Sequence, residues 1–169
     1  MYRITFILSI FIGTLNLQGQ DEAAKEVLTK WENASQYTID LIEAMPEEHF
    51  DFQPTPETRT FTEQVSHMVD NMTWLSTDYL GAEKFDAKEP TTKAEYLEYM
   101  RLACAYAGNS IAVALQDSTL LDTKMDFFAG PMSGRQIIRL MNNHVTHHRG
   151  QLIVYLRLKG IKPPRYVGW

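Results

Sequence analysis

Apolar residues recur along most of the chain at the three- and four-residue spacing of amphipathic helices. This pattern predicts four long helices, at about residues 21–45, 60–80, 92–116 and 133–159. The last three begin with a Ser or Thr followed three residues later by Glu or Gln, as in a capping box. Helix-ending residues follow the first, second and fourth segments, namely Pro46, Gly81 and Gly160.

The segments between these helices contain no strand-rich region or internal repeat. Residues 46–60 hold three prolines and predict a loop, whereas residues 117–132 predict a long connection with a short extended piece. Four amphipathic helices of this length bury their apolar faces most simply against one another. We therefore expect an all-α four-helix bundle formed by residues 21–169 as a single domain.

The N-terminal segment has a different character. Arg3 precedes an uncharged run of 14 residues, Ile4–Leu17, and the sequence becomes acidic at Asp21. This run has the length of a signal-peptide core and is short for a membrane span. We predict that residues 1–20 are a signal peptide that is removed, leaving a periplasmic or extracellular protein without stable membrane insertion. The alternative is an uncleaved N-terminal anchor.

Composition narrows the range of functions. The formal net charge is −5, from 16 Lys and Arg against 21 Asp and Glu, so a general nucleic-acid partner is not expected. Cys104 is the single cysteine, which excludes an internal disulfide framework and a cysteine-rich metal site. Its position beside an apolar helix stripe favours a small buried residue over a reactive thiol.

The histidines provide the candidate chemistry. His144 and His148 are four residues apart on the fourth predicted helix, so both can reach one metal ion from one helix face. His147 points about 100° away from that line. A third ligand must come from another helix, and His67, in the middle of the second, is the candidate. Three neutral imidazoles would leave a coordination position open, as in catalytic zinc sites.

Two sequence blocks resemble the DinB-like superfamily of metalloproteins. They are HMVDNMTWL in the second helix and NNHVTHHRGQLIVYLRLKGIKPP in the fourth, and FDFQPTPETRTFTEQVSHM also matches the family. The resemblance covers residues 21–169 and implies a four-helix bundle with up-down-down-up order, usually as a homodimer. It also implies one divalent metal ion on His67, His144 and His148. We favour zinc or nickel, and imidazole ligands also suit iron and copper.

Polar residues near these histidines are candidates for the surroundings of the metal. Asp70 and Asn71 follow His67 by three and four residues, and Gln151 and Tyr155 follow His148 by three and seven. Each could orient a ligand or line a substrate pocket, or instead belong to a solvated face or the core. We predict that Arg149 forms a structural ion pair. No sequence motif identifies a catalytic residue.

Three functions are compatible with such a site. Relatives in the superfamily include thiol-dependent S-transferases, which makes a metal-dependent transferase acting on a small molecule with a low-molecular-weight thiol the leading hypothesis. A metal-water hydrolase is the second. A non-catalytic metal- or ligand-binding module of a stress response is the third.

Overall fold

The protein is described here by a computed structural model. Its backbone is described from residue 2 to residue 169 and its side chains from residue 22 to residue 169. Residues 1–20, the predicted signal peptide, lie outside the residues whose side chains are described, so their removal stays a prediction. Among the residues described, no helix has an apolar stretch that would suffice to cross a membrane.

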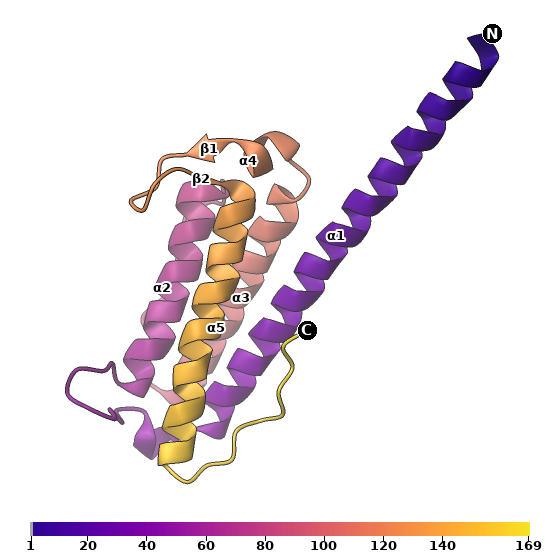
Figure 1. Ribbon diagram of the computed structural model, residues 1–169. Coiled ribbons are helices and arrows are strands. Elements are labelled where there is room, and N and C mark those ends of the chain that lie inside the picture. The colour runs from indigo at the N-terminus through magenta and orange to yellow at the C-terminus, as the bar shows by residue number, and fades with distance from the viewer. Residues whose placement is uncertain (1) are drawn as a thin grey trace.

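Four long helices make up most of the molecule (Figure 1), which confirms the all-α fold class. They are α1 (Tyr2–Ala44), α2 (Phe61–Tyr79), α3 (Lys93–Ala114) and α5 (Gly134–Leu158). Short elements lie between them: η1 (Glu47–His49), α4 (Ser118–Asp122), and the antiparallel strands β1 (Lys124–Met125) and β2 (Met132–Ser133). The first helix begins at Tyr2, before the predicted start near residue 21.

The helix boundaries follow the sequence signals. The Thr60 hydroxyl accepts a hydrogen bond from the Glu63 N–H at 3.2 Å, and the Thr60 N–H donates to the Glu63 carboxylate at 2.7 Å. The same reciprocal pair joins Thr92 and Glu95 at the start of α3. Gly81 and Gly160 have φ values of 72° and 74°, a conformation that glycine adopts without steric cost after a helix end.

The directions of the helices follow from contacts at one end of the bundle. The ring of Phe50 packs against Phe61 at the start of α2 and against Tyr96 in the first turns of α3. The Lys93 ammonium donates to the Met45 carbonyl just beyond α1. Tyr155, near the end of α5, packs on Phe52. Helices α2 and α3 therefore start at this end, where α1 and α5 finish (Figure 1).

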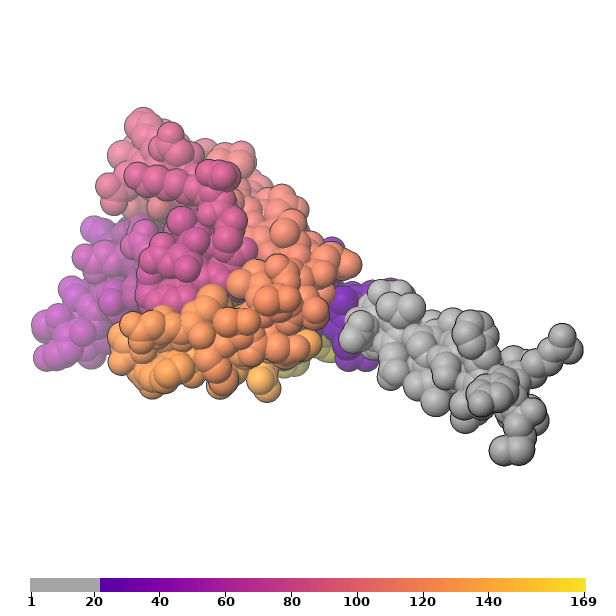
Figure 2. All heavy atoms as spheres, turned by 90° about the horizontal axis from the view of Figure 1, so that it is seen from above, coloured from indigo at the N-terminus to yellow at the C-terminus, as the bar shows by residue number. Residues whose placement is uncertain are grey.

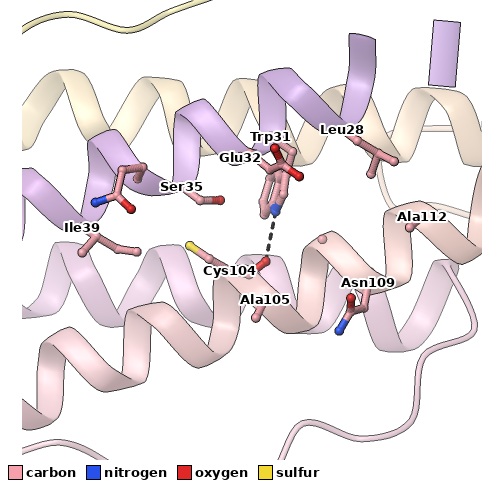
Figure 3. Close-up of a pocket in the computed structure, with 11 residues that line it drawn as sticks. Leu28, Trp31, Glu32, Ser35, Ile39, Cys104, Ala105, Asn109 and Ala112 are labelled. Carbon is pink, nitrogen blue, oxygen red and sulfur yellow. Dashed lines mark hydrogen bonds between the residues drawn. The ribbon is translucent and has the colours of Figure 1, made fainter. Parts of the chain in front are cut away.

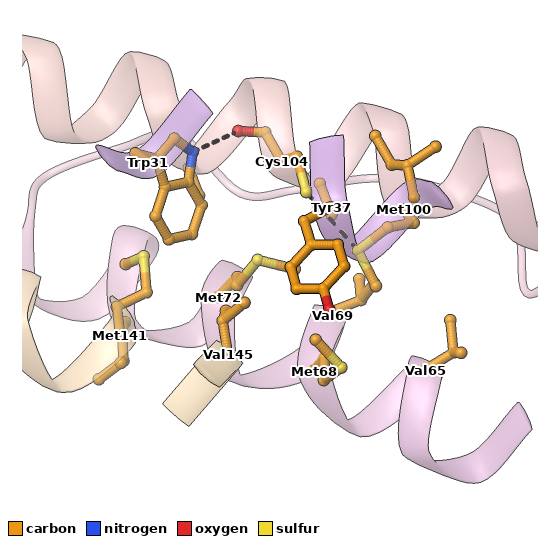
Figure 4. Packing of buried hydrophobic residues seen from close by; sticks show 14 of the residues in the cluster. Trp31, Tyr37, Val65, Met68, Val69, Met72, Met100, Cys104, Met141 and Val145 are labelled. Carbon is orange, nitrogen blue, oxygen red and sulfur yellow. Dashed lines mark hydrogen bonds between the residues drawn. The ribbon is translucent and has the colours of Figure 1, made fainter. Parts of the chain in front are cut away.

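The core lies between the four long helices and is rich in methionine (Figure 4). Met68 and Met72 from α2 and Met141 from α5 are fully buried there, with Trp31 from α1 beside them. Helix α2 contacts α3 and α5 but is diagonal to α1. This packing fixes α2 and α5 as neighbours, and these two helices carry the candidate histidines.

The other end of the bundle is closed by α4 and the two short strands, whose orange atoms face the viewer in Figure 2. The strand pair supplies the extended piece that the sequence predicts, whereas α4 was not predicted. The Asp117 side chain caps α4 by accepting from the Leu120 N–H at 3.0 Å. A five-residue helix is too short to show an apolar period, which is why the hydrophobic pattern did not reveal it.

Candidate metal centre

The three histidines suggested by the sequence come together between α2 and α5. The Nε2 atom of His144 lies 3.2 Å from Nε2 of His67 and 3.1 Å from Nε2 of His148. All three donor atoms lie within 4.8 Å of one another. His148 is buried, and His67 and His144 are partly exposed. His67 and His144 are 77 positions apart in the sequence, yet together with His148 they form one compact donor set.

A glutamine orients the most buried of these ligands. The Nδ1 atom of His148 lies 2.7 Å from Oε1 of Gln64, which is itself buried on α2. An amide oxygen only accepts hydrogen bonds, so Nδ1 of His148 carries the proton. In the neutral ring, Nε2 then holds the free lone pair, and that atom faces the other two histidines.

The surroundings keep these rings neutral. Burial, followed by the nearby charges of His144 and His67, lowers the pKa of His148 to about 3. Burial and then charge repulsion from His67 lower the pKa of His144 to about 4. The pKa of His67 is also lowered, mainly by burial and then by Arg59, with Asp70 opposing the shift. Neutral imidazoles are the form that binds a metal ion.

The donor set fits a divalent metal ion. A tetrahedral zinc with Zn–N bonds of about 2.0–2.1 Å separates its nitrogen ligands by about 3.3 Å. The observed Nε2 separations of 3.1 and 3.2 Å are close to that spacing. The Nε2 lone pair of His148 faces the Nε2 atom of His144, and one cation between the rings would bind the lone pairs of all three histidines. His67, His144 and His148 could therefore hold one ion.

A polar network surrounds the donor set. The Gln64 amide nitrogen donates to Oε1 of Gln151 and, at 3.3 Å, to the Tyr155 hydroxyl. The Tyr155 hydroxyl donates to the Arg59 carbonyl at 2.6 Å. Two of the residues that the sequence suggested near the metal, Gln151 and Tyr155, thus hydrogen-bond to Gln64 and, among the described residues, not to the histidine trio. Gln64 was missed, although it precedes His67 by three residues on the same helix face.

The other two suggested neighbours take different positions. Asp70 is exposed and lines a cleft that also reaches His67. The Oδ1 atom of Asn71 is buried and has no hydrogen-bond partner among the described residues, as is also true of Nδ1 of His144. Asn71 is not among the described residues that line the cleft, and the structure shows no role for it.

A polar cleft of about 940 Å³ opens beside His67. Its walls come from the loop before α2, from the first turns of α2 and from Gln151 on α5. Charged side chains line it: Glu57, Arg59, Glu63 and Asp70. The sequence predicted this loop but not its place beside the histidines, because that depends on how the proline-rich segment folds back.

Replacing Gln64 by leucine tests the orienting role of the amide. The change keeps a similar volume but removes the acceptor for His148 Nδ1, so we expect metal affinity to fall about 10- to 100-fold. Competition titration with a chromophoric chelator measures this fall. Gln36→Leu on the exposed face of α1, whose amide nitrogen donates to the Asp40 carboxylate, is the matched control and is expected to bind as the unaltered protein does. Equal affinities in both variants would contradict this role.

Three other residues singled out in the sequence are not part of the donor set, although the His147 ring packs edge-on against that of His148 with 4.9 Å between ring centres. His147 is exposed, and its Nε2 atom contacts the Gln151 amide nitrogen at 2.9 Å. Cys104 is buried beside a shallow pocket between α1 and α3 (Figure 3), where burial raises the pKa of its thiol to about 11. The expected ion pair of Arg149 is wrong: its guanidinium contacts the Ala34 carbonyl, the Thr146 hydroxyl and the Tyr37 ring.

Comparisons with known proteins place this geometry in context. A family model described as the DinB family matches residues 18–168. The uncharacterized protein YjoA of Bacillus subtilis is 26% identical over 129 residues, which span 73% of this chain and 82% of YjoA. The crystal structure of that DinB-like protein superposes with a TM-score of 0.66 at 21% identity, covering 85% of this chain and 99% of YjoA.

A second solved structure has the same fold. A DinB-like protein from Bacillus cereus superposes with a TM-score of 0.66 at 23% identity, and the match covers 85% of this chain and 97% of that one. At such identities the likeness demonstrates the fold alone, and the chemistry must be argued from the residues themselves.

Proposed function

The chain belongs to the DinB family, and on that premise we propose that it is a metal-dependent enzyme that transfers a low-molecular-weight thiol to a small electrophile. His67, His144 and His148 would hold the metal ion. The observation that supports catalysis is the cleft beside His67, because a purely structural metal site is closed on all sides by protein ligands. The cleft gives a small molecule access to the donor set.

The bound ion would lower the pKa of a coordinated thiol or water molecule and so supply a nucleophile near neutral pH. Side chains around the site would orient a metal ligand and bind the substrate. Gln64 holds His148 with its lone pair toward the site. Arg59 is the one cationic side chain lining the cleft among the described residues, and it would bind an anionic group of the thiol or the electrophile.

A carboxylate in the same cleft could accept a proton from the incoming nucleophile. Hydrogen bonds with Thr55 and with its own backbone lower the pKa of Glu57 and make it a weaker base. Glu63 is occupied by its hydrogen bond with the Thr60 N–H at the helix cap. Asp70 is exposed, lines the cleft and has no side-chain hydrogen bond among the described residues. Asp70 is therefore the residue that we assign as proton acceptor.

A metal-water hydrolase is the second candidate, on two grounds. Asp70 could serve equally as general base for water, and the predicted export signal would separate the protein from thiol cosubstrates, which are mainly cytosolic. The third candidate, a non-catalytic metal- or ligand-binding module, would hold the ion or a ligand without converting a substrate. We further propose that the exported protein acts as a homodimer, as the family resemblance implies.

Thiol titration of the cobalt-substituted protein tests the proposal. We expect a thiolate-to-cobalt charge-transfer band with at least one low-molecular-weight thiol, together with transfer of that thiol to a test electrophile. His147→Ala should retain both signals, and His144→Ala should lose both. Absence of the band, with ester or amide hydrolysis that His144→Ala abolishes, would replace the transferase by the hydrolase. Absence of both activities in the metal-loaded protein would leave the binding module.

A further inference from the structure

A buried arginine without an acidic partner lies on the side of α5 away from the histidines. Arg149 is 5% exposed, yet no carboxylate oxygen lies within 4.0 Å of its guanidinium among the described residues. Arginine stays protonated in proteins, and a buried charge without an opposite charge is costly. The residue follows His148 directly, so its side chain leaves the helix about 100° around the axis from that ligand.

The contacts that Arg149 does make are weak. One Nη atom lies 3.3 Å from the Ala34 carbonyl and the other lies 3.4 Å from the Thr146 hydroxyl, both beyond the usual N–H···O range of about 2.7–3.2 Å. The guanidinium also lies over the Tyr37 ring, 5.1 Å from its centre. A guanidinium has five N–H donors, so much of its hydrogen-bonding capacity is free for another acceptor.

Arg149 lines a small cavity of about 200 Å³ between α1, α5 and the C-terminal segment. The polar and charged side chains around it are Lys30, Asn142, Asn143, Thr146, Arg149 and Tyr166. None of the residues lining this cavity is acidic, although the chain as a whole carries a net charge of −5. The C-terminal segment covers the cavity, with Tyr166 packed edge-on against Tyr37 at 6.1 Å.

We propose that this cavity is a binding site for a small oxyanion, either a phosphate-type group or a carboxylate. Arg149 provides the planar pair of donors that such anions bind, and Lys30 provides a second positive charge. The amides of Asn142 and Asn143 and the Thr146 hydroxyl offer further hydrogen bonds to its oxygen atoms. The volume suits a free anion or a small anionic molecule and excludes a large one.

This site is separate from the candidate metal centre. None of the residues lining the cavity lines the cleft beside His67, and the two openings lie on different sides of α5. Binding of an anion here is therefore expected to persist when a metal-binding histidine is removed. That independence separates this proposal from the proposed function, because either can fail without the other.

Isothermal titration of the full chain with inorganic phosphate, and separately with sodium acetate, at constant ionic strength tests the proposal. We expect saturable binding of at least one of these anions to a single site, with a matching rise in thermal unfolding midpoint by mass action. Preference for phosphate or for acetate tells which of the two groups the site takes. No saturable heat and no midpoint shift with either probe would overturn the proposal.

Single-residue variants test whether the anion binds in the cavity lined by Arg149. Lys30→Gln at the exposed rim removes one charge without disturbing the buried arginine, and we expect it to weaken anion binding by about tenfold. Lys84→Gln makes the same charge change in the connection after α2 and is expected to bind normally. A folded Arg149→Met variant should not bind the anion. Unchanged affinity in Lys30→Gln, or loss of binding in His144→Ala, would contradict the assignment to this cavity.

Discussion

Replacing His148 by alanine is expected to abolish stoichiometric binding of a divalent metal ion. His148 is the most buried of the three donors, and its Nε2 atom lies 3.1 Å from that of His144. Removing one of three ligands leaves two imidazoles and an opened position, so affinity should fall by at least about 100-fold, more than the loss of an orienting partner costs. His67→Ala and His144→Ala are expected to have the same effect.

The matched control for these variants is His147→Ala. It removes an exposed imidazole that packs edge-on against the His148 ring, but its Nε2 atom lies 2.9 Å from the Gln151 amide nitrogen and it is not one of the three clustered donors. Elemental analysis after equilibrium dialysis against zinc and nickel compares the four proteins. Full metal content in His67→Ala would disprove the participation of α2, and loss of metal in His147→Ala would place the ion elsewhere on α5.

The sequence predicted the helices and the His144 and His148 pair for the same physical reason. Each long helix buries a continuous apolar stripe, which leaves a period of three and four in the sequence, and its capping residues mark where the stripe begins. His144 and His148 share that period, so their common face was visible without a structure. His67 was assigned from its place in the middle of a second apolar stripe and from the family resemblance.

Features that depend on contacts between distant segments could not be predicted in this way. The hydrogen bond that His148 Nδ1–H donates to the Gln64 amide oxygen joins residues 84 positions apart, and it requires the register between α2 and α5. The position of Arg59 depends on the fold of the proline-rich loop, in which the Gln53 amide donates to the Thr58 carbonyl at 2.5 Å. The ion pair predicted for Arg149 was wrong because the position of a residue in the sequence does not show which groups its side chain contacts.

The second large expected effect is on stability, and it concerns the contact between α1 and α3. Trp31 is 3% exposed, and its indole N–H donates to the Cys104 carbonyl at 3.0 Å (Figure 3). Trp31→Ala removes a large buried ring and leaves a cavity between these helices, so the free energy of unfolding should fall by about 3–5 kcal/mol. Urea denaturation followed by circular dichroism measures the change.

Gly108 offers a sharper test of the same contact, through a double-mutant cycle. A Cβ atom at Gly108 would lie 3.1 Å from both Cδ1 and Nε1 of Trp31, tighter than ordinary contact. Alanine in a helix interior is favoured over glycine by about 1 kcal/mol, but with Trp31 present the crowding should offset that gain. In the Trp31→Ala background the crowding is absent, so Gly108→Ala should raise the free energy of unfolding by about 1 kcal/mol. An equal effect of Gly108→Ala in both backgrounds would show that the indole does not pack against this glycine.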